Sequence, residues 1–212
     1  MSEPLAIAAA IAAAYLLGSL PFGYLAGRAR GVDIRTVGSR NVGATNVFRT
    51  LGKPIGIAVM AADIAKGVLA VVLARWITDD PWPLVAAGAA VVGHVYPLWL
   101  RFRGGKGVAV GCGVAIGLMP LAVLVLVPVW VVVIVATRYV SLGSIVAAAA
   151  LTPTVWAFGY EWPTVAFAAL ISVAVIGRHH ANIRRLLRRE ELRIDLGRRR
   201  RDGNPGAGAG PV

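Results

Sequence analysis

Residues 107–137 read GVAVGCGVAIGLMPLAVLVLVPVWVVVIVAT, a run without one charged side chain that decides how the chain is built. As a single α-helix this run would be roughly 47 Å long, against roughly 30 Å of hydrocarbon in a bilayer. Two shorter helices fit better, and Gly117 and Pro120 mark the expected break. The alternative is one long tilted helix with a kink at Pro128. The choice sets whether the chain crosses a membrane six or seven times.

The rest of the chain is also too apolar for a soluble protein. Hydrophobic residues make up 58% of the 212 residues and charged residues only 15%. Further apolar runs, most of them close to the ~20 residues that span a bilayer, lie at 5–27, 54–76, 82–100, 141–158 and 162–178. The sequence therefore predicts an all-α polytopic membrane protein.

The placement of Lys and Arg favours seven spans over six. Six of these residues lie at 28–53, three at 101–106, one at Arg138 and ten at 178–201. With seven transmembrane helices and the N-terminus outside, all four segments fall on one side, as the excess of Lys and Arg in cytoplasmic loops requires. With six, Arg138 and the basic C-terminal run cannot both share a side with the first two segments. We therefore expect a cytoplasmic C-terminus.

The chain divides into one membrane domain, residues 1–188, and a tail, residues 189–212. The tail is basic and then rich in Gly, Ala and Pro, so we expect it to be disordered. The net charge of +12 flanks apolar spans instead of forming a stripe on a soluble domain, which argues against nucleic-acid binding. A basic cytoplasmic face would instead attract anionic membrane lipids and phosphorylated substrates.

The longest polar connection, GVDIRTVGSRNVGATNVFRTLGK at 31–53, is the first candidate site. It holds Ser39, Asn41 and Asn46 among arginines, and glycines such as Gly38 allow the backbone to approach a ligand closely. This density of Gly, Ser and Asn favours a bound anion. A basic loop that only orients the protein in the membrane is the alternative.

A second candidate is GHVYPLWLRFRGGKGVAVGCG at 93–113, where one span ends and the next begins. Backbone N–H groups of Gly104, Gly105 and Gly107 and a helix N-terminus can face an anion there, with Lys106 as the point charge. The pattern is typical of phosphate binding but is not a Walker loop. A flexible turn is the alternative. We interpret His94, inside a span, as a packed and hydrogen-bonded histidine.

Two weaker patterns follow. Ser141 and Ser144 in RYVSLGSI are spaced to share one face of a helix, although such serines usually bond back to the helix. His179 and Asn182, three residues apart at the end of the last span, can converge on one ligand. Two adjacent histidines also fit a solvated basic helix end.

Charges inside the second apolar run need a partner. Asp63 and Lys66 are three residues apart, and we expect them to pair with each other because an unpaired charge in a membrane costs several kcal/mol. His, Cys and Glu lack the spacing of a metal site, and the nucleophile motif GxSxG is missing. We expect no cofactor and no metal.

Taken together, GSRNVGATN at 38–46 with Arg49, then GHVYPLWLRFRGGKGVA, SLGSI and the spacing of His179 and Asn182 resemble the acyl-phosphate:glycerol-3-phosphate acyltransferase family of bacterial inner membranes. The likeness runs from about Gly18 to Asn182 with the motifs in family order. It implies seven spans and an active site that opens to the cytoplasm. It also implies transfer of a fatty acyl group from acyl phosphate to the 1-hydroxyl of glycerol 3-phosphate, giving lysophosphatidate and phosphate, with no protein partner evident.

The resemblance also assigns roles to residues. The catalytic set that it implies is Ser39, Arg49, Lys106, Ser144, His179 and Asn182. The substrate-binding set is Gly38, Asn41, Asn46, Gly104, Gly105, Gly107 and Ser141. Because no carboxylate belongs to these sets, the substrate's own phosphate is the expected proton acceptor, and His179 is the rival base.

Arg40 departs from the family pattern, which usually has glycine at this position, and adds positive charge beside the anion site. Two other function classes stay open. A carrier or channel for a phosphorylated solute fits the basic face, although the polar loops lie on one side only. A lipid phosphatase would need a nucleophile and an acid that the sequence does not offer.

Overall fold

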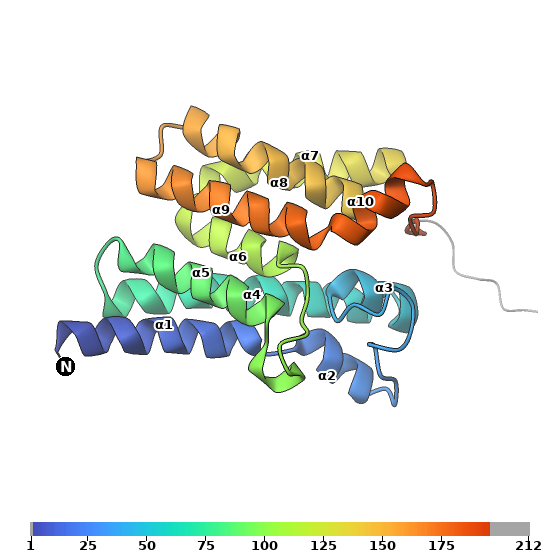
Figure 1. Cartoon of the computed structure of the whole chain (residues 1–212), viewed down its shortest axis with the longest axis horizontal. Coiled ribbons are helices and arrows are strands. Elements are labelled where there is room, and N and C mark those ends of the chain that lie inside the picture. Colours follow the sequence, from blue (N-terminus) through green and yellow to red (C-terminus); the bar gives the residue numbers. More distant parts are fainter. Residues whose placement is uncertain (1, 196–212) are drawn as a thin grey trace, which may run out of the picture.

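The structure, a computed structural model, describes residues 2–195, and every regular element in this part is a helix (Figure 1). Prolines in the first turn, where a missing N–H costs nothing, begin five of the long helices. The helices are α1 (Glu3–Ser19), α2 (Phe22–Arg28), α3 (Ala44–Leu51), α4 (Lys53–Ile77), α5 (Trp82–Val95), the 3-10 turn η1 (Leu98–Leu100), α6 (Val108–Leu118), α7 (Pro120–Thr137), α8 (Val140–Ala157), α9 (Trp162–Arg178) and α10 (His180–Leu187).

The long apolar run breaks where the sequence predicts. Helix α6 ends at Leu118 and α7 begins at Pro120, with Met119 in a non-helical conformation between them. Because the helix breaks at Met119, the alternative of a single helix across 107–137 that is kinked at Pro128 is wrong. Pro128 lies inside α7. The break confirms that Pro120 starts a new helix because its ring cannot continue the old one.

The expected number of spanning helices is not confirmed. Five stretches in residues 2–195 are long and apolar enough to cross a membrane, and a sixth counts if α9 and α10, bent by 56°, form one span. Helix α6 has 11 residues and is therefore only roughly 17 Å long. It is short because it begins after Gly107 and the break at Met119 ends it.

Helices α1 and α2 form one interrupted span, Glu3–Arg28. Pro21 ends α1, and the break leaves the carbonyl of Leu20 outside the helical ladder. Lys66 Nζ donates a hydrogen bond to this carbonyl at 2.7 Å. The N–H of Phe22 donates to the same oxygen at 3.2 Å, so a lysine in α4 supplies a second donor that a bilayer could not.

Small residues bring the first helices together. Ala10 and Ala14 of α1 pack against Ala86 and Ala90 of α5 and against Ala70 of α4. Such residues let helix backbones approach closely. Figure 1 shows α6 between this group and the layer formed by α7, α8 and α9.

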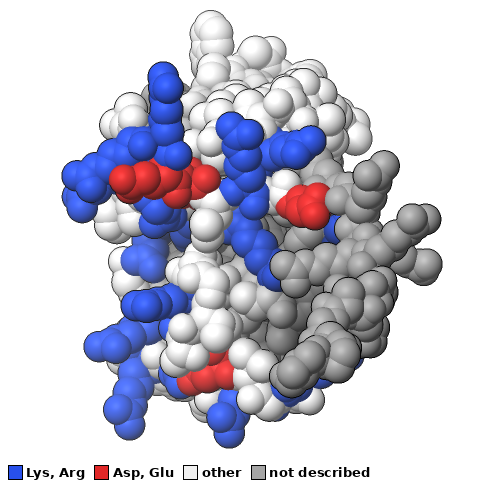
Figure 2. Space-filling view, turned by 90° about the vertical axis from the view of Figure 1, so that its right-hand side faces the viewer, with Lys and Arg blue, Asp and Glu red and all other residues white. Residues whose placement is uncertain are grey.

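All four basic segments meet at one end of the molecule. Arg49 Nη2 donates to the carbonyl of Leu192 at 2.8 Å, and the N–H of Ile194 donates to the carbonyl of Arg138. Lys106 reaches Asn182 in the same region. Figure 2 looks onto this end and shows Lys and Arg gathered across it. Within residues 2–195 the four segments lie at one end of the protein because the helices between them run in alternate directions. The arginines at 198–201 lie outside the described residues.

The predicted tail boundary needs correction. Residues 189–195 belong to the expected disordered tail, yet Glu191 and Ile194 are buried, and Ile194 packs with Ile134 and Val140. Apolar and hydrogen-bonding partners on α7, α8 and α10 offset the entropy of ordering this short stretch. Residues 196–212, the rest of the predicted tail, lie outside the described residues.

Candidate active site

A cavity of about 310 Å³ opens among α3, α4, α6, α7, α8 and α9 and the segment 189–195. Apolar side chains from α6 to α9 line most of its wall, and polar groups gather at the basic end of the molecule. Every predicted site residue except Gly38, Gly104 and Gly105 lines it: Ser39, Asn41, Asn46, Arg49, Lys106, Gly107, Ser141, Ser144, His179 and Asn182. Segments far apart in sequence thus form one site.

Asn46 holds the first polar loop in shape. Its side-chain amide donates to the carbonyls of Ile34, Val37 and Asn41, and its Oδ1 accepts the N–H of Ser39 at 2.8 Å. Gly38 adopts the left-handed region, φ 58°, and a Cβ there would lie 2.3 Å from Asn46 Oδ1. Any residue other than glycine would push Asn46 out of place.

These contacts add a structural role to three residues of the predicted substrate-binding set. The hydrogen bonds of Asn46 all go to the loop, and Asn41 Oδ1 accepts the N–H of Gly43 at 2.8 Å. Gly38 does not line the cavity. Gly38, Asn41 and Asn46 therefore shape the loop that presents Ser39, and direct contact of these three with a substrate stays a prediction.

Arg49 on α3 brings a guanidinium to the cavity. One nitrogen bonds to the carbonyl of Leu192, while buried Nε has no hydrogen-bond partner in residues 2–195. Burial lowers the pKa of Arg49, and the field of Glu191 partly opposes that effect. A buried donor without a partner that faces a cavity is available to an anion.

The N–H groups of the glycine loop, residues 104–107, have other partners than the sequence predicts. The N–H of Gly104 donates to the carbonyl of Val95, and that of Gly105 donates to the carbonyl of His94, both at 3.0 Å. The expectation that these two groups face an anion is wrong, because the end of α5 already accepts them. Gly107 begins α6 with φ 85° and lines the cavity. The free N–H groups at this point are therefore those of the first turn of α6.

Lys106 extends from this loop into the cavity. Its Nζ donates to Asn182 Oδ1 at 2.5 Å. Burial lowers the pKa of Lys106 to about 8, with nearby arginines adding to the effect and Glu191 opposing it. A desolvated lysine beside arginines is poised to bind a phosphate, which would restore the balance of charge.

Glu191 is a site residue that sequence reasoning missed. Its Oε1 accepts hydrogen bonds from Ser141 Oγ at 2.8 Å and Asn182 Nδ2 at 2.7 Å, and Oε2 accepts from Arg185 Nε at 2.7 Å. Burial would raise the pKa of this carboxyl, but the hydrogen bonds from Asn182, Arg185 and Ser141 outweigh it and the pKa is lowered. An acidic pair, Glu190–Glu191, inside a run of arginines was the available signal.

Two further predicted residues contact the backbone of their own helices. Ser144 Oγ donates to the carbonyl of Val140 at 2.9 Å and accepts from Trp130 Nε1 at 3.2 Å. His179 Nδ1 lies 2.7 Å from the carbonyl of Val175, so Nδ1 carries the proton. The other ring nitrogen of neutral His179 is then an acceptor.

Comparison with known proteins identifies the family. A family model described as glycerol-3-phosphate acyltransferase matches residues 8–189. The glycerol-3-phosphate acyltransferase of Geobacter sulfurreducens is 48% identical over 184 residues, which cover 86% of this chain and 95% of that protein. The chain belongs to the glycerol-3-phosphate acyltransferase family.

Other relatives agree with this assignment of the acyltransferase. The protein of the same name from Geotalea daltonii is 46% identical over 177 residues, covering 83% of this chain and 91% of the relative. A crystal structure of PlsY, an integral membrane glycerol 3-phosphate acyltransferase in its glycerol 3-phosphate form, has 39% identity and a TM-score of 0.85, covering 89% of this chain and 96% of that one. Together with the apolar helices, these likenesses make this acyltransferase a multi-pass membrane enzyme of phospholipid synthesis.

The departure at Arg40 has a local explanation in the acyltransferase. Arg40 is exposed and adopts a left-handed conformation, φ 59°. Glycine reaches this region without the cost of about 1–2 kcal/mol that a Cβ brings. Because the guanidinium is in solvent, its charge is screened from the cavity.

Proposed function

We propose that the protein transfers a fatty acyl group from an acyl phosphate to the 1-hydroxyl of glycerol 3-phosphate, giving lysophosphatidate and inorganic phosphate. The supporting observation is the composition of one cavity, in which Lys106 and Arg49 occupy one end and side chains such as Leu126 and Leu151 line the rest. The cationic end suits the phosphates of both substrates, and the apolar part suits a hydrocarbon chain.

The chemistry needs little beyond positioning. An acyl phosphate is a mixed anhydride, so the glycerol hydroxyl oxygen attacks the carbonyl carbon and the bond to the phosphate oxygen breaks. Phosphate leaves with the electron pair, and the hydroxyl proton passes to a phosphate oxygen. Holding two anions in line supplies much of the rate in such a reaction.

We assign roles to the cavity residues on this basis. Arg49 binds the phosphate of glycerol 3-phosphate with two parallel hydrogen bonds. Lys106 and the first turn of α6 bind the acyl phosphate, in place of the N–H groups of Gly104 and Gly105. Ser39, Ser144 and Asn182 orient glycerol 3-phosphate.

The proton acceptor is either the substrate's phosphate or His179, and we favour the phosphate. His179→Ala separates the two, measured as rate against pH. A positioned general base contributes about 10²–10⁴-fold, so retention of roughly a tenth of the activity excludes an essential base at His179. A loss of 10²-fold or more with a changed acid limb would make His179 the base.

We place this site on the cytoplasmic face of a bacterial inner membrane because the basic segments meet there. Glycerol 3-phosphate does not cross a bilayer unaided, so sealed vesicles test the side. Inverted vesicles should form product and right-side-out vesicles should not. The reverse result would place the site outside.

The deciding test is an assay of the purified protein with radiolabelled glycerol 3-phosphate and one of three donors: palmitoyl phosphate, acyl-CoA or acyl carrier protein. Lysophosphatidate should form only with palmitoyl phosphate, and EDTA should have no effect. Lys106→Ala should abolish it, whereas Arg103→Ala, an exposed basic residue of the same loop, should not. Product with acyl-CoA or acyl carrier protein would contradict the proposal that the donor is an acyl phosphate. No product with any donor would make transport of a phosphorylated solute the next hypothesis.

A further inference from the structure

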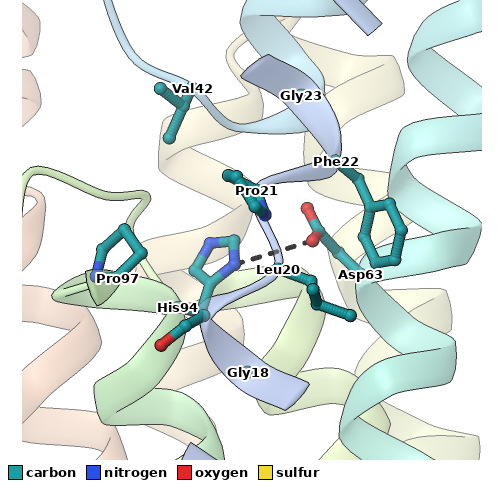
Figure 3. Close-up of a pocket in the computed structure, with 10 residues that line it drawn as sticks. Gly18, Leu20, Pro21, Phe22, Gly23, Val42, Asp63, His94 and Pro97 are labelled. Atoms are coloured by element: carbon teal, nitrogen blue, oxygen red, sulfur yellow. Dashed lines mark ion pairs between the residues drawn. The ribbon is translucent and has the colours of Figure 1, made fainter. Parts of the chain in front are cut away.

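Three titratable groups lie buried inside the membrane-spanning helices, beside the active site. Asp63 and Lys66 of α4 form an ion pair with 2.7 Å between Oδ1 and Nζ. His94 Nδ1 of α5 lies 3.6 Å from the same Oδ1. Figure 3 shows the carboxylate and the imidazole facing one another beside the Leu20–Pro21 break. We call Asp63, Lys66 and His94 the span cluster.

The break between α1 and α2 explains why a lysine is buried at position 66, but it does not explain why a histidine is buried at position 94. Lys66 bonds to the carbonyl of Leu20 and neutralises Asp63, so the charge of Asp63 is balanced without His94. An ionisable side chain at membrane depth usually has a function.

His94 contacts the glycine loop through both its backbone and its side chain. Its carbonyl accepts the N–H of Gly105 at 3.0 Å. Its ring lies so close to the loop that a Cβ on Gly105 would be 2.1 Å from Nε2. Gly105 is thus a close approach of the loop backbone to an imidazole, which only glycine permits.

Asp63 and His94 also separate two cavities. One is the active-site cavity, and the other, of about 10 Å³, is lined by Ser19 and Pro21 among others. Asp63 and His94 line both cavities. No hydrogen-bond partner of His94 Nε2 is found within residues 2–195. The imidazole therefore lies between the small cavity and the active-site cavity. It contacts Asp63 through Nδ1 and approaches the glycine loop through Nε2.

We propose that His94 is a positioning residue of the acyltransferase: oriented by Asp63, its ring holds Gly105, and through Gly105 the first turn of α6 and Lys106, in the conformation that receives the donor's phosphate. The distance of 3.6 Å between Asp63 Oδ1 and His94 Nδ1 exceeds hydrogen-bond length, so Asp63 orients the imidazole through its charge. The identity of the donor rests on the proposed function, whereas the support of the loop does not.

Kinetics of paired variants test this role. His94→Asn keeps a nitrogen near Asp63 but leaves a gap beneath Gly105, and His94→Gln places a nitrogen near the loop. We expect the KM for palmitoyl phosphate to rise about tenfold or more in His94→Asn, because small displacements of binding groups are costly. The KM for glycerol 3-phosphate and kcat should change less than about threefold, and His94→Gln should restore part of the loss.

The matched control is Ser172→Ala on α9. Ser172 is as buried as His94 and hydrogen-bonds to Thr152, but it does not line the active-site cavity. Both variants should lose some thermal stability, and only the His94 variant should change the KM for the donor. A fall in stability with unchanged KM values would overturn the proposal, as would a loss confined to kcat.

Hydrogen exchange measured by mass spectrometry tests the loop whether or not the donor is an acyl phosphate. The N–H groups of Gly104 and Gly105 bond to the carbonyls of Val95 and His94 and should exchange slowly. In His94→Asn they should exchange at least several times faster while α8 is unchanged. Unchanged exchange in the loop would overturn the proposal even if the enzyme uses palmitoyl phosphate. Inactivity of the wild type with that donor would instead count against the proposed function alone.

Discussion

The two buried charge clusters of this protein are built in opposite ways. The span cluster brings its acid and its lysine from one helix turn and encloses them beside a cavity of about 10 Å³. The second, which we call the pocket cluster, consists of Arg49, Lys106, Arg185 and Glu191. Arg49, Lys106 and Glu191 line a cavity of about 310 Å³, and half-buried Arg185 pairs with Glu191. In the first, Asp63 and Lys66 cancel. In the second, three positive charges meet one negative charge and leave two uncompensated.

This difference separates stability from function. A neutral, closed pair holds helices together and tolerates burial in a bilayer. An open cluster with surplus positive charge is unfavourable until an anion fills it, which is the property that a phosphate site needs. Breaking the Asp63–Lys66 pair should therefore affect folding first, and breaking the pocket cluster should affect substrate binding first.

The largest effect is expected from Lys66→Ala. The change leaves Asp63 buried without its ion-pair partner and removes one of two donors to the Leu20 carbonyl, which should cost about 3–5 kcal/mol of unfolding free energy. Denaturation in detergent micelles, followed by circular dichroism, measures it. The double variant Asp63→Ala, Lys66→Ala should recover part of the loss, because no unpaired charge remains. Wild-type stability in the single variant would contradict the view that the pair is structural.

Glu191→Ala comes next. The change strips the acceptor from Ser141, Asn182 and Arg185, and we expect a loss of about 2 kcal/mol because buried donors are left unpaired. The loss of kcat/KM, expressed as a free energy, should exceed the loss of unfolding free energy, since Asn182 also bonds to Lys106. The control is Glu190→Ala, an exposed neighbour, which should behave as wild type in both measurements. Equal effects of the two substitutions would show that 189–195 is not part of the site.

The pH dependence of kcat/KM should report the titration of Lys106 in the pocket cluster. The pKa of Lys106 is lowered to about 8, so Lys106 loses its charge as the pH rises through 8 and phosphate affinity should fall about tenfold per pH unit above that point. Glu191 raises this pKa, so Glu191→Gln should move the alkaline limb to lower pH. Lys106→Arg should remove the limb, because arginine stays charged. A limb that survives Lys106→Arg would belong to another group.

The smallest effect is expected from Asp33→Ala. Asp33 and Arg35 form an exposed ion pair of 2.7 Å, and the hydrogen bond from Arg35 lowers the pKa of Asp33 to about 2. Solvent screens such pairs, so neither the melting temperature nor the kinetic constants should shift measurably. A clear fall in melting temperature would mean that exposed ion pairs also stabilise this protein.

Sequence by itself determined what depends on local spacing and on total hydrophobicity. The bilayer as solvent, the break before Pro120, the pairing of Asp63 with Lys66 and the gathering of basic segments at one end all follow from runs and spacings of a few residues. The family motifs also placed Ser39, Arg49, Lys106, Ser144, His179 and Asn182 in one site, and all of them line the cavity.

Tertiary structure alone decided what depends on contacts between distant segments. Glu191 reaches Ser141 across 50 residues and Arg49 reaches Leu192 across 143, so a segment expected to be disordered completes the site. The carbonyl groups at the end of α5 accept the N–H groups of Gly104 and Gly105, so these two groups are not free to bind an anion. Periodicity and composition report the preferences of single segments, whereas these outcomes depend on which hydrogen-bonding groups meet after the helices have packed.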